Sequence, residues 1–234
     1  AESFFGVDLW TAYELSWLDM RGKPVVAVAE LSIPCSTPNL VESKSLKLYL
    51  NSLNQERYRS VEEVALTIER DVSTCVMGPV LVGVHPGDSF RHLGLGSLPG
   101  ICLDDQRLDV DTYAPDASLL GLANRQTVVS ESLYSHLLKT NCPVTGQPDW
   151  ASILIRYSGP AIDHEGLLRY LISFRNHQDF HEQCVERIFT EINELCLPES
   201  LEVYARYTRR GGLEINPYRS SVQSEPPRVR LSRQ

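Results

Sequence analysis

The stretch LKLYLNSL at residues 46–53 and the stretch LLRYLISF at residues 167–174 follow the same pattern. Leucine, tyrosine, leucine and serine recur at four equivalent places, with an offset of 121 residues, about half of the chain. Self-similarity at a fixed offset indicates that one structural unit occurs twice. The expected order of strands and helices around each stretch supports this repeat.

Around the first stretch we expect two strands, two helices and two further strands. The turn-rich MRGKP separates the first two strands, and a short helix over 44–53 follows. A second helix, about 61–75, has apolar residues spaced i, i+3, i+4 and i+7, and Ser60 with Glu63 supplies its capping box. The expected strands are DLWTAYELSWL (8–18), PVVAVAELSI (24–33), PVLVGVHP (79–86) and ICLDDQRLDVDTY (101–113).

The same order is expected around the second stretch, where a turn-rich segment again separates the first two strands. Helices are expected at about 164–175 and 180–196, the second with a clear apolar stripe. Residues 129–138 also fit a helical period, and the repeat favours a strand there. The expected strands are TVVSESLYSHLL (127–138), ASILIRYS (151–158), SLEVYARYT (200–208) and GLEINPY (212–218).

Two ββααββ units in tandem indicate an α+β fold, with antiparallel sheets and helices packed on one face. The boundary is expected within YAPDASLLGLANR, which makes the two halves residues 1–118 and 119–234. Because each half is small, we expect the halves to share a large interface. The basic, proline-containing tail SSVQSEPPRVRLSRQ is expected to lie as an arm over the surface or over a partner subunit.

Composition excludes several classes of protein. The formal net charge of −8 on 234 residues disfavours a phosphate-binding face, so we expect no nucleic-acid partner. No apolar run approaches the ~20 residues that span a bilayer, and AESFFGVDLW lacks the features of a signal peptide. The six cysteines form no CxxC pair and no zinc-ligand spacing. We therefore expect a cytoplasmic protein with reduced thiols and no metal.

Four polar segments stand out on this frame: ESKSLK (42–47), CPVTGQPDW (142–150), FHE (180–182) and RRGG (209–212). In this order they resemble the QueF family, the NADPH-dependent 7-cyano-7-deazaguanine (preQ0) reductases of the tunnelling fold (T-fold). The resemblance covers essentially the whole chain and corresponds to the long, tandem-domain form. It implies NADPH-dependent reduction of the preQ0 nitrile to the aminomethyl group of preQ1, through a covalent thioimide, in queuosine biosynthesis for tRNA.

Cys142 is the candidate nucleophile. It follows a strand and opens a polar turn that contains Pro143, Gly146 and Pro148, a poor place to bury a thiol for its volume. A lone cysteine is more often a packing residue. A nitrile carbon is electrophilic, however, and a thiolate is well suited to attack it. The resemblance assigns this attack to Cys142, which would need a nearby base, cation or oriented dipole for activation.

The resemblance gives three further residues roles around this nucleophile. Asp149 could simply cap the next strand, whereas the family implies that it donates protons. Asp179 and Glu182 have the spacing of a capping box, whereas the family implies that Glu182 accepts hydrogen bonds from the guanine-like edge of the substrate. His181 is assigned to the same pocket.

The segments ESKSLK and RRGG are the candidate contacts for substrate and cofactor. Their structural alternatives are a charged first turn of a helix and a basic β-turn. Lysine and arginine suit the 2′-phosphate that distinguishes NADPH, and glycine permits close approach of the backbone. The resemblance places Val41, Glu42 and Ser43 against the substrate, and Ser43, Lys44, Arg210 and Gly211 against NADPH.

The glycine-rich HLGLGSLPG at 92–100 lacks the GxGxxG spacing and a following helix, so we expect a loop there and no Rossmann unit. At the offset of 121 residues, Arg21 stands in place of Cys142, and residues 163–165 stand in place of Glu42–Lys44. Neither half holds a complete set. We therefore expect one active site per chain, at the junction of the halves, with the first half supplying cofactor contacts.

Three other functions remain open at this point. A thiol nitrile hydrolase or amidase would release ammonia without consuming NADPH. A zinc-dependent cyclohydrolase on the same fold would need a Cys/His ligand set. A non-reductive purine- or pterin-binding protein would not depend on Cys142. The exposed sheet edges of the T-fold also favour self-association, and we expect a homodimer.

Overall fold

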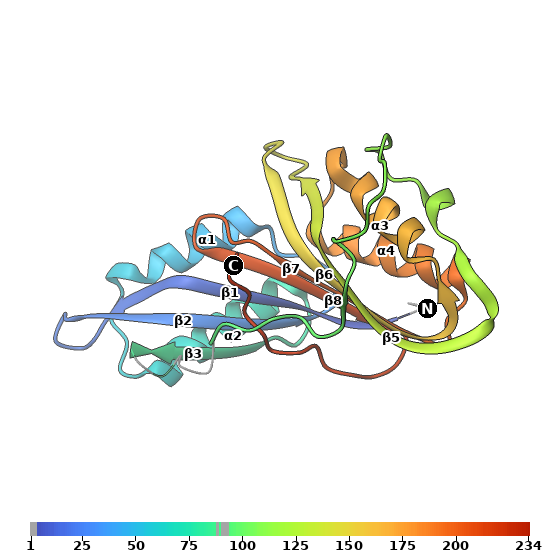
Figure 1. Ribbon diagram of the computed structural model, residues 1–234. Helices are drawn as coiled ribbons and strands as arrows, with labels where there is room; N and C mark the ends of the chain where they lie inside the picture. Colours follow the sequence, from blue (N-terminus) through green and yellow to red (C-terminus); the bar gives the residue numbers. More distant parts are fainter. Residues whose placement is uncertain (1–3, 88, 90–93) are drawn as a thin grey trace. The chain divides into compact units, whose positions relative to one another are not determined.

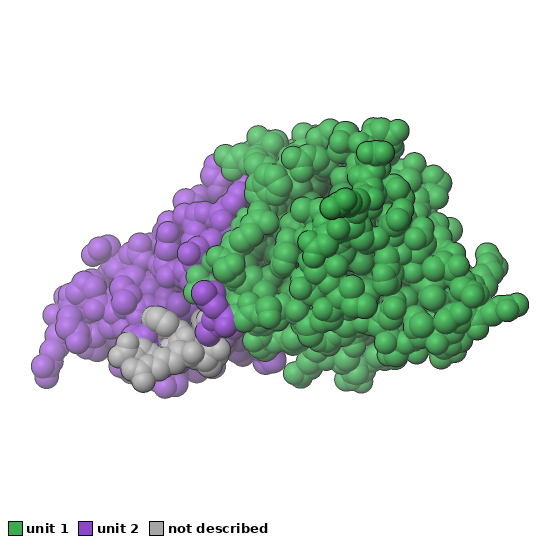
Figure 2. Space-filling view, in the orientation of Figure 1, with its two compact units in different colours: residues 1–5, 96–208, 216–234 green, residues 6–95, 209–215 purple. Residues whose placement is uncertain are grey.

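The computed structural model describes residues 4–87, 89 and 94–234, which form two compact units (Figures 1 and 2). Unit 2 comprises residues 6–95 and 209–215, and unit 1 comprises residues 1–5, 96–208 and 216–234. Strand β8 (Leu213–Ser220) therefore begins in unit 2 and ends in unit 1. The boundary expected near residue 118 stays a prediction.

Unit 2 contains a three-stranded antiparallel arrangement in the order β3-β2-β1. The turn between β1 and β2 is closed by Asp19, whose carboxylate accepts hydrogen bonds from the backbone of Arg21 and Lys23, both at 2.9 Å. Tyr13 N donates to the Gly212 carbonyl at 2.9 Å, which ties the turn before β8 to β1. The elements are β1 (Phe5–Leu18), β2 (Pro24–Pro34), α1 (Ser43–Ser52), the 3₁₀ helix η1 (Leu53–Gln55), α2 (Val61–Val76) and β3 (Leu81–Pro86).

The core of unit 2 lies between β1, β2 and the two helices. Every second residue of β2 from Ala27 to Ile33 is buried, and so are Val64, Ile68 and Val72 along one side of α2. Ser60 caps α2, because its hydroxyl accepts a hydrogen bond from Glu63 N at 3.2 Å. The expected cap is therefore confirmed, although the Glu63 carboxylate reaches back to Arg59 N.

Unit 1 has the strand order β7-β6-β5-β4, with the end of β8 beside β7. All neighbouring strands in it are antiparallel except β4 and β5, which are parallel. The long β5–β6 hairpin dominates the unit and carries α3 and α4 against one face (Figure 1). The elements are β4 (Ile101–Cys102), the 3₁₀ helix η3 (Ala117–Leu119), β5 (Leu122–Asn141), β6 (Pro148–Ile162), α3 (His164–Ser173), the 3₁₀ helix η4 (Phe174–Asn176), α4 (His181–Cys196) and β7 (Ser200–Tyr207).

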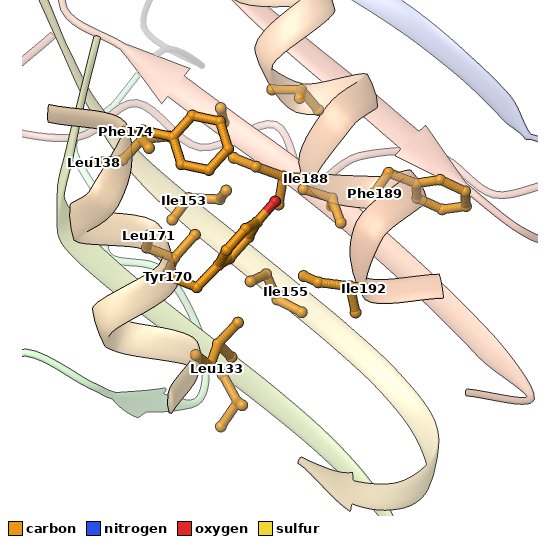
Figure 3. Packing of buried hydrophobic residues seen from close by; sticks show 14 of the residues in the cluster. Leu133, Leu138, Ile153, Ile155, Tyr170, Leu171, Phe174, Ile188, Phe189 and Ile192 are labelled. Atoms are coloured by element: carbon orange, nitrogen blue, oxygen red, sulfur yellow. The ribbon is translucent and has the colours of Figure 1, made fainter. Parts of the chain in front are cut away.

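The core of unit 1 is formed by the two helices and the sheet face that they cover. Figure 3 shows residues of β5, β6, α3 and α4 pointing into one apolar cluster. The single polar group among those it labels, the Tyr170 hydroxyl, donates to the Glu191 carboxylate. The packing of these two helices thus identifies the helix-facing side of β6. The labelled residues are Leu133, Leu138, Ile153, Ile155, Tyr170, Leu171, Phe174, Ile188, Phe189 and Ile192.

The predicted α+β class, with antiparallel sheets and helices packed against them, is confirmed. Residues 129–138 lie in strand β5, as the repeat favoured. The strand expected over 101–113 is wrong, because only Ile101–Cys102 is a strand and it pairs in parallel with β5. The Asp104 carboxylate accepts hydrogen bonds from Ser135 Oγ at 2.6 Å and His136 N at 2.9 Å, which diverts the chain from strand geometry.

Two other sequence expectations concern loops and membranes. In the glycine-rich segment, His92 and Leu93 lie outside the described residues, and residues 94–100 form no helix. Among the helices of the described residues, none has the length and apolar character to cross a membrane.

The apolar stripe of α4 gives a direct test of the core. Ile188 is fully buried, whereas Leu195 on the same helix is 47% exposed. We expect Ile188→Ala to lower the free energy of unfolding by about 2–5 kcal/mol, because it leaves a cavity. Leu195→Ala should change it by less than about 0.5 kcal/mol. Urea unfolding of both variants measures the difference, and equal losses would contradict this packing.

Candidate functional site

The first cluster of polar residues lies at the end of the β5–β6 hairpin. In its register Thr140 pairs with Asp149 and Asn141 pairs with Pro148. Cys142 N donates to the Gln147 carbonyl at 2.8 Å, which extends the ladder by one more pair. The loop closes because Gly146, with φ of +68°, donates its N–H to the Cys142 carbonyl at 2.9 Å. Cys142 is therefore held at the mouth of a tight loop.

The register determines the side of the sheet that Cys142 faces. Residues paired across strands point to the same face, and side chains alternate along each strand. Cys142 therefore faces the same side as Thr140 and Asp149, which is the helix-covered side that also carries Ala151. Cys142 is half-buried, in contrast to the fully buried Cys184. Its thiol is thus placed at the edge of the core.

The segment before α4 is attached to the same hairpin end. Asn141 N donates to the His177 carbonyl at 2.7 Å, and Asp179 N donates to the Asn141 carbonyl at 3.2 Å. Lys139 Nζ adds a hydrogen bond to the Arg175 carbonyl at 2.8 Å. These bonds bring the first turn of α4 beside the residues that precede Cys142.

His181, the first residue of α4, completes this cluster. Its Nε2 lies 3.3 Å from an oxygen of Asp149, a carboxylate that is only 3% exposed. The imidazole stacks on the ring of Tyr207, with centroids 3.8 Å apart and planes 3° from parallel. Its Nδ1 is buried and makes no hydrogen bond within the described part of the chain. A polar ligand atom would satisfy this nitrogen.

Glu182 is buried in the same turn, with 5% of its surface exposed. The capping box expected as its structural alternative is wrong. The N-cap of α4 is Phe180, whose side chain makes no capping bond, and Asp179 accepts a hydrogen bond from Phe180 N instead. Burial of a carboxylate costs free energy. Helix capping therefore does not explain why this glutamate is buried beside His181.

The residues behind His181 belong to the buried core of unit 1. Burial raises the pKa of the Tyr207 phenol well above its ordinary value. Burial also raises the pKa of the Cys184 thiol to about 12. Both groups stay neutral near pH 7, so the stacked ring offers His181 a flat, uncharged support. Sequence reasoning missed Tyr207, because one tyrosine in an alternating strand carries no distinguishing signal.

The second cluster lies in unit 2, at the start of α1. Glu42 is the N-cap of this helix, and its carboxylate accepts hydrogen bonds from Lys44 N, Ser45 N and Ser45 Oγ at 2.7–2.9 Å. The Ser45 hydroxyl, followed by the backbone donors, lowers the Glu42 pKa. Val41 packs against the core of unit 2, and Ser43 is the first helical residue. The structural alternative for Glu42 is therefore confirmed.

The glycine turn of RRGG lies beside α1 in the same unit. Lys47 Nζ donates to the Gly211 carbonyl and lies 3.5 Å from Glu14. Lys44 is one turn earlier, on the same side of the helix. Gly211 has φ of +57°, a conformation that favours glycine. Lys47 was missed by the sequence analysis, although it ends the quoted ESKSLK motif.

The four polar segments thus form two pairs. CPVTGQPDW and FHE meet in unit 1, with Cys142, Asp149, His181 and Glu182 around one hairpin end. ESKSLK and RRGG meet in unit 2 through Lys47 and Gly211. In neither pair, nor elsewhere among the described residues, do three His, Cys, Asp or Glu side chains gather as metal ligands would.

Known proteins are similar to this chain over nearly its whole length. A family model described as "Nitrile reductase, 7-cyano-7-deazaguanine-reductase N-term" matches residues 1–84, and one described as "QueF-like protein" matches residues 148–226. Proteins named NADPH-dependent 7-cyano-7-deazaguanine reductase from Azoarcus sp. (strain BH72) and Burkholderia multivorans are 57% and 56% identical to this chain. The matches cover 95% and 99% of this chain and 78% and 85% of those proteins. The chain belongs to this reductase family.

One solved structure is similar to less than half of this chain. The archaeosine synthase QueF-Like, in its apo form, matches with a TM-score of 0.36 and 16% identity. That match covers 42% of this chain and 96% of the other.

Exposure and burial predict which thiols of this reductase-family chain react. Burial raises the pKa of Cys184 to about 12 and that of Cys196 to about 11, and neither side chain is exposed. Because the thiolate is the reactive form, we expect iodoacetamide near pH 8 to label Cys142 and the exposed Cys75 and to spare Cys184 and Cys196. Peptide mass mapping measures this pattern. Labelling of Cys184 before Cys142 in the folded protein would contradict it.

Proposed function

We propose that this chain reduces the nitrile of preQ0 to the aminomethyl group of preQ1, with Cys142 as a covalent nucleophile. Membership of the NADPH-dependent 7-cyano-7-deazaguanine reductase family supplies the overall reaction and the cofactor. The observation that carries the covalent route is the hairpin register. In this register the half-buried Cys142 lies on the same face of the sheet as Asp149, which contacts His181.

The first step we propose is addition of Cys142 to the nitrile. A new bond joins Sγ to the nitrile carbon, and one π pair of the C≡N group moves to nitrogen, which takes up a proton. This addition gives a thioimide and oxidises nothing. We assign proton transfer to Asp149, because its carboxyl group is buried on the same face as Cys142 and contacts the imidazole of His181.

Glu182 and His181 are the proposed anchors of the substrate ring. A carboxylate is the natural acceptor for the adjacent N–H and amino donors of a guanine-like edge. Glu182 is buried in the first turn of α4 without serving as its N-cap, next to His181. His181 Nδ1 has an unmet hydrogen-bonding capacity, which a polar atom of a ligand would satisfy. Val41, Glu42 and Ser43 remain proposed substrate contacts, although the bonds of Glu42 are also those of a helix cap.

The residues of unit 2 fit a phosphate-bearing cofactor. NADPH supplies a hydride in each of two successive reductions when it is bound. Lys44 is exposed on α1, and the Gly211 turn lies one helical turn away beside Lys47. We propose that Ser43, Lys44, Arg210 and Gly211 hold the cofactor, with the cations on its phosphates. Between the two reductions the bond between the substrate carbon and the sulfur of Cys142 breaks. We propose that Asp149 donates a proton to the departing sulfur.

The proposal also covers the division of the chain, its self-association and its location. We propose that the half 1–118 supplies Ser43 and Lys44 to the cofactor, and that the half 119–234 supplies the nucleophile together with the cofactor contacts Arg210 and Gly211. Strand β3 pairs with β2 on one side and exposes Leu81 to 71%, which supports self-association as a homodimer. We also propose a cytoplasmic location and no direct contact with nucleic acid, which the net charge of −8 supports.

The covalent step is tested by removing one sulfur atom. We expect Cys142→Ala to form no adduct with preQ0 and to lose more than about 10³-fold in NADPH oxidation, because no nucleophile remains. Intact mass after incubation with preQ0, together with NADPH absorbance, measures both. Cys75→Ala, at an exposed thiol, is the control and should behave as the unchanged protein. Full turnover by Cys142→Ala would refute the covalent route, and ammonia release without NADPH oxidation would favour a hydrolase.

The cofactor contacts are tested at the glycine turn. We expect Gly211→Ala to raise the KM for NADPH about 10-fold and to leave the KM for preQ0 unchanged, because the positive φ disfavours alanine and the turn shifts. Gly121→Ala is the matched control, since its φ is not positive and an added Cβ meets nothing within 4 Å. Steady-state kinetics with each substrate varied measures both constants. The idea fails if only the KM for preQ0 responds.

A further inference from the structure

The C-terminal tail packs against the rest of unit 1. The sequence suggested an arm over the surface or over a partner, but Leu231 and Gln234 are each only 5% exposed. Gly96 N donates to the Arg230 carbonyl at 2.9 Å, and Arg233 donates to the His136 carbonyl at 3.3 Å. The tail is therefore packed on the strands of its own chain.

Gln234 makes a complete set of side-chain hydrogen bonds in this position. Its Oε1 accepts from Arg206 Nε at 2.9 Å and from Leu231 N at 3.0 Å. Its Nε2 donates to the Tyr207 carbonyl at 3.2 Å and to Asn216 Oδ1 at 3.0 Å. Such a buried amide, satisfied on both its oxygen and its nitrogen, is specific in orientation.

These bonds converge on the backbone of Tyr207. Asn216 Oδ1, which Gln234 holds, also accepts from Tyr207 N at 3.0 Å. Both polar backbone groups of Tyr207 are therefore fixed by the Gln234–Asn216 pair. The ring of the same residue points to the helix-covered face, where it stacks on His181 at 3.8 Å. His181 in turn contacts Asp149 at 3.3 Å.

Arg233, the tail residue next to Gln234, contacts strand β6 of the site. The guanidinium of Arg233 lies over the Trp150 ring, 5.8 Å from its centroid, and Arg175 lies 5.7 Å from the same ring. Cation–π contacts are effective up to about 6 Å. Trp150 directly follows Asp149 in β6. Arg233 thus contacts β6, which carries Asp149, and Gln234 contacts β7, which carries the tyrosine stacked on His181.

We propose that Gln234 is a positioning residue for the reaction, which acts through Tyr207 to hold the His181 ring beside Asp149. The expected effect on catalysis rests on the proposed function, whereas the expected effect on the position of the His181 ring does not. Gln234 touches no reacting atom, and its effect is transmitted by one backbone and one stacked ring. Small displacements of catalytic groups lower rates far more than they lower affinity for remote parts of a substrate.

The test replaces the donor end of the amide. Gln234→Glu keeps the oxygen for Arg206 and Leu231 N but loses both donations from Nε2. We expect kcat to fall about 10-fold with the KM for NADPH unchanged. We also expect the ring resonances of His181 to move away from their stacked position in spectra of protein with labelled histidine. The chain has only six histidines, and His181→Gln identifies the signal.

Two further variants separate positioning from general destabilisation. Gln234→Met lacks the same donor without adding charge and should reproduce both effects. Ile68→Ala, at a fully buried residue of α2 in unit 2, should lower the thermal midpoint and leave kcat and the His181 resonances unchanged. An unchanged kcat and an unchanged His181 signal in Gln234→Glu would overturn the proposal, as would an equal loss of kcat in Ile68→Ala.

Failure of the proposed function would look different. If the unchanged protein formed no adduct with preQ0, the covalent route would fail, while the His181 resonances would still report whether Gln234 holds the ring. If the adduct formed normally and Gln234→Glu changed nothing, only the positioning role would be lost.

Discussion

The arrangement of the candidate site depends on one register, in which Thr140 faces Asp149 across the β5–β6 hairpin. A shift by one residue would turn Cys142 and Asp149 to the opposite face of the sheet. The register is held by the Cys142–Gln147 hydrogen bond at the loop and by buried aliphatic residues further along both strands. The core of unit 1 therefore determines which side of the sheet the sulfur of Cys142 faces, on which the proposed covalent route depends.

A second constraint is the burial of the groups around His181. Tyr207 and Cys184 are buried and neutral, and they lie behind the Asp149–His181 contact. Electrostatic interactions between buried groups are stronger than in water, and a buried polar atom without a partner is costly. The hydrogen bonds of Asn216 and Gln234 satisfy the backbone N–H and carbonyl of Tyr207. The Tyr207 hydroxyl and His181 Nδ1, in contrast, have no hydrogen-bond partner within the described part of the chain.

Much of this architecture could be predicted from the sequence. Strand alternation, the apolar stripe of α2 and the capping role of Ser60 are local properties, and the repeat placed residues 129–138 in a strand. The strand expected over 101–113 failed because Asp104 finds its partners at Ser135 and His136, far away in the sequence. Tyr207, Lys47 and Gln234 were missed for the same reason. Their roles arise from tertiary contacts, and no local pattern distinguishes them from other tyrosine, lysine or glutamine residues.

The two hairpin ends are docked in the same way. Leu18 N donates to the Glu56 carbonyl at 2.9 Å and Tyr58 N donates to the Leu18 carbonyl at 3.0 Å, as Asn141 bonds to residues 177 and 179. Both contacts are parallel bridges, Leu18 with Arg57 and Asn141 with Gln178. Docking of the hairpin end is therefore a property of the scaffold, and it does not by itself create a site. The chemical difference lies in the side chain that each turn presents, an arginine at residue 21 and a cysteine at residue 142.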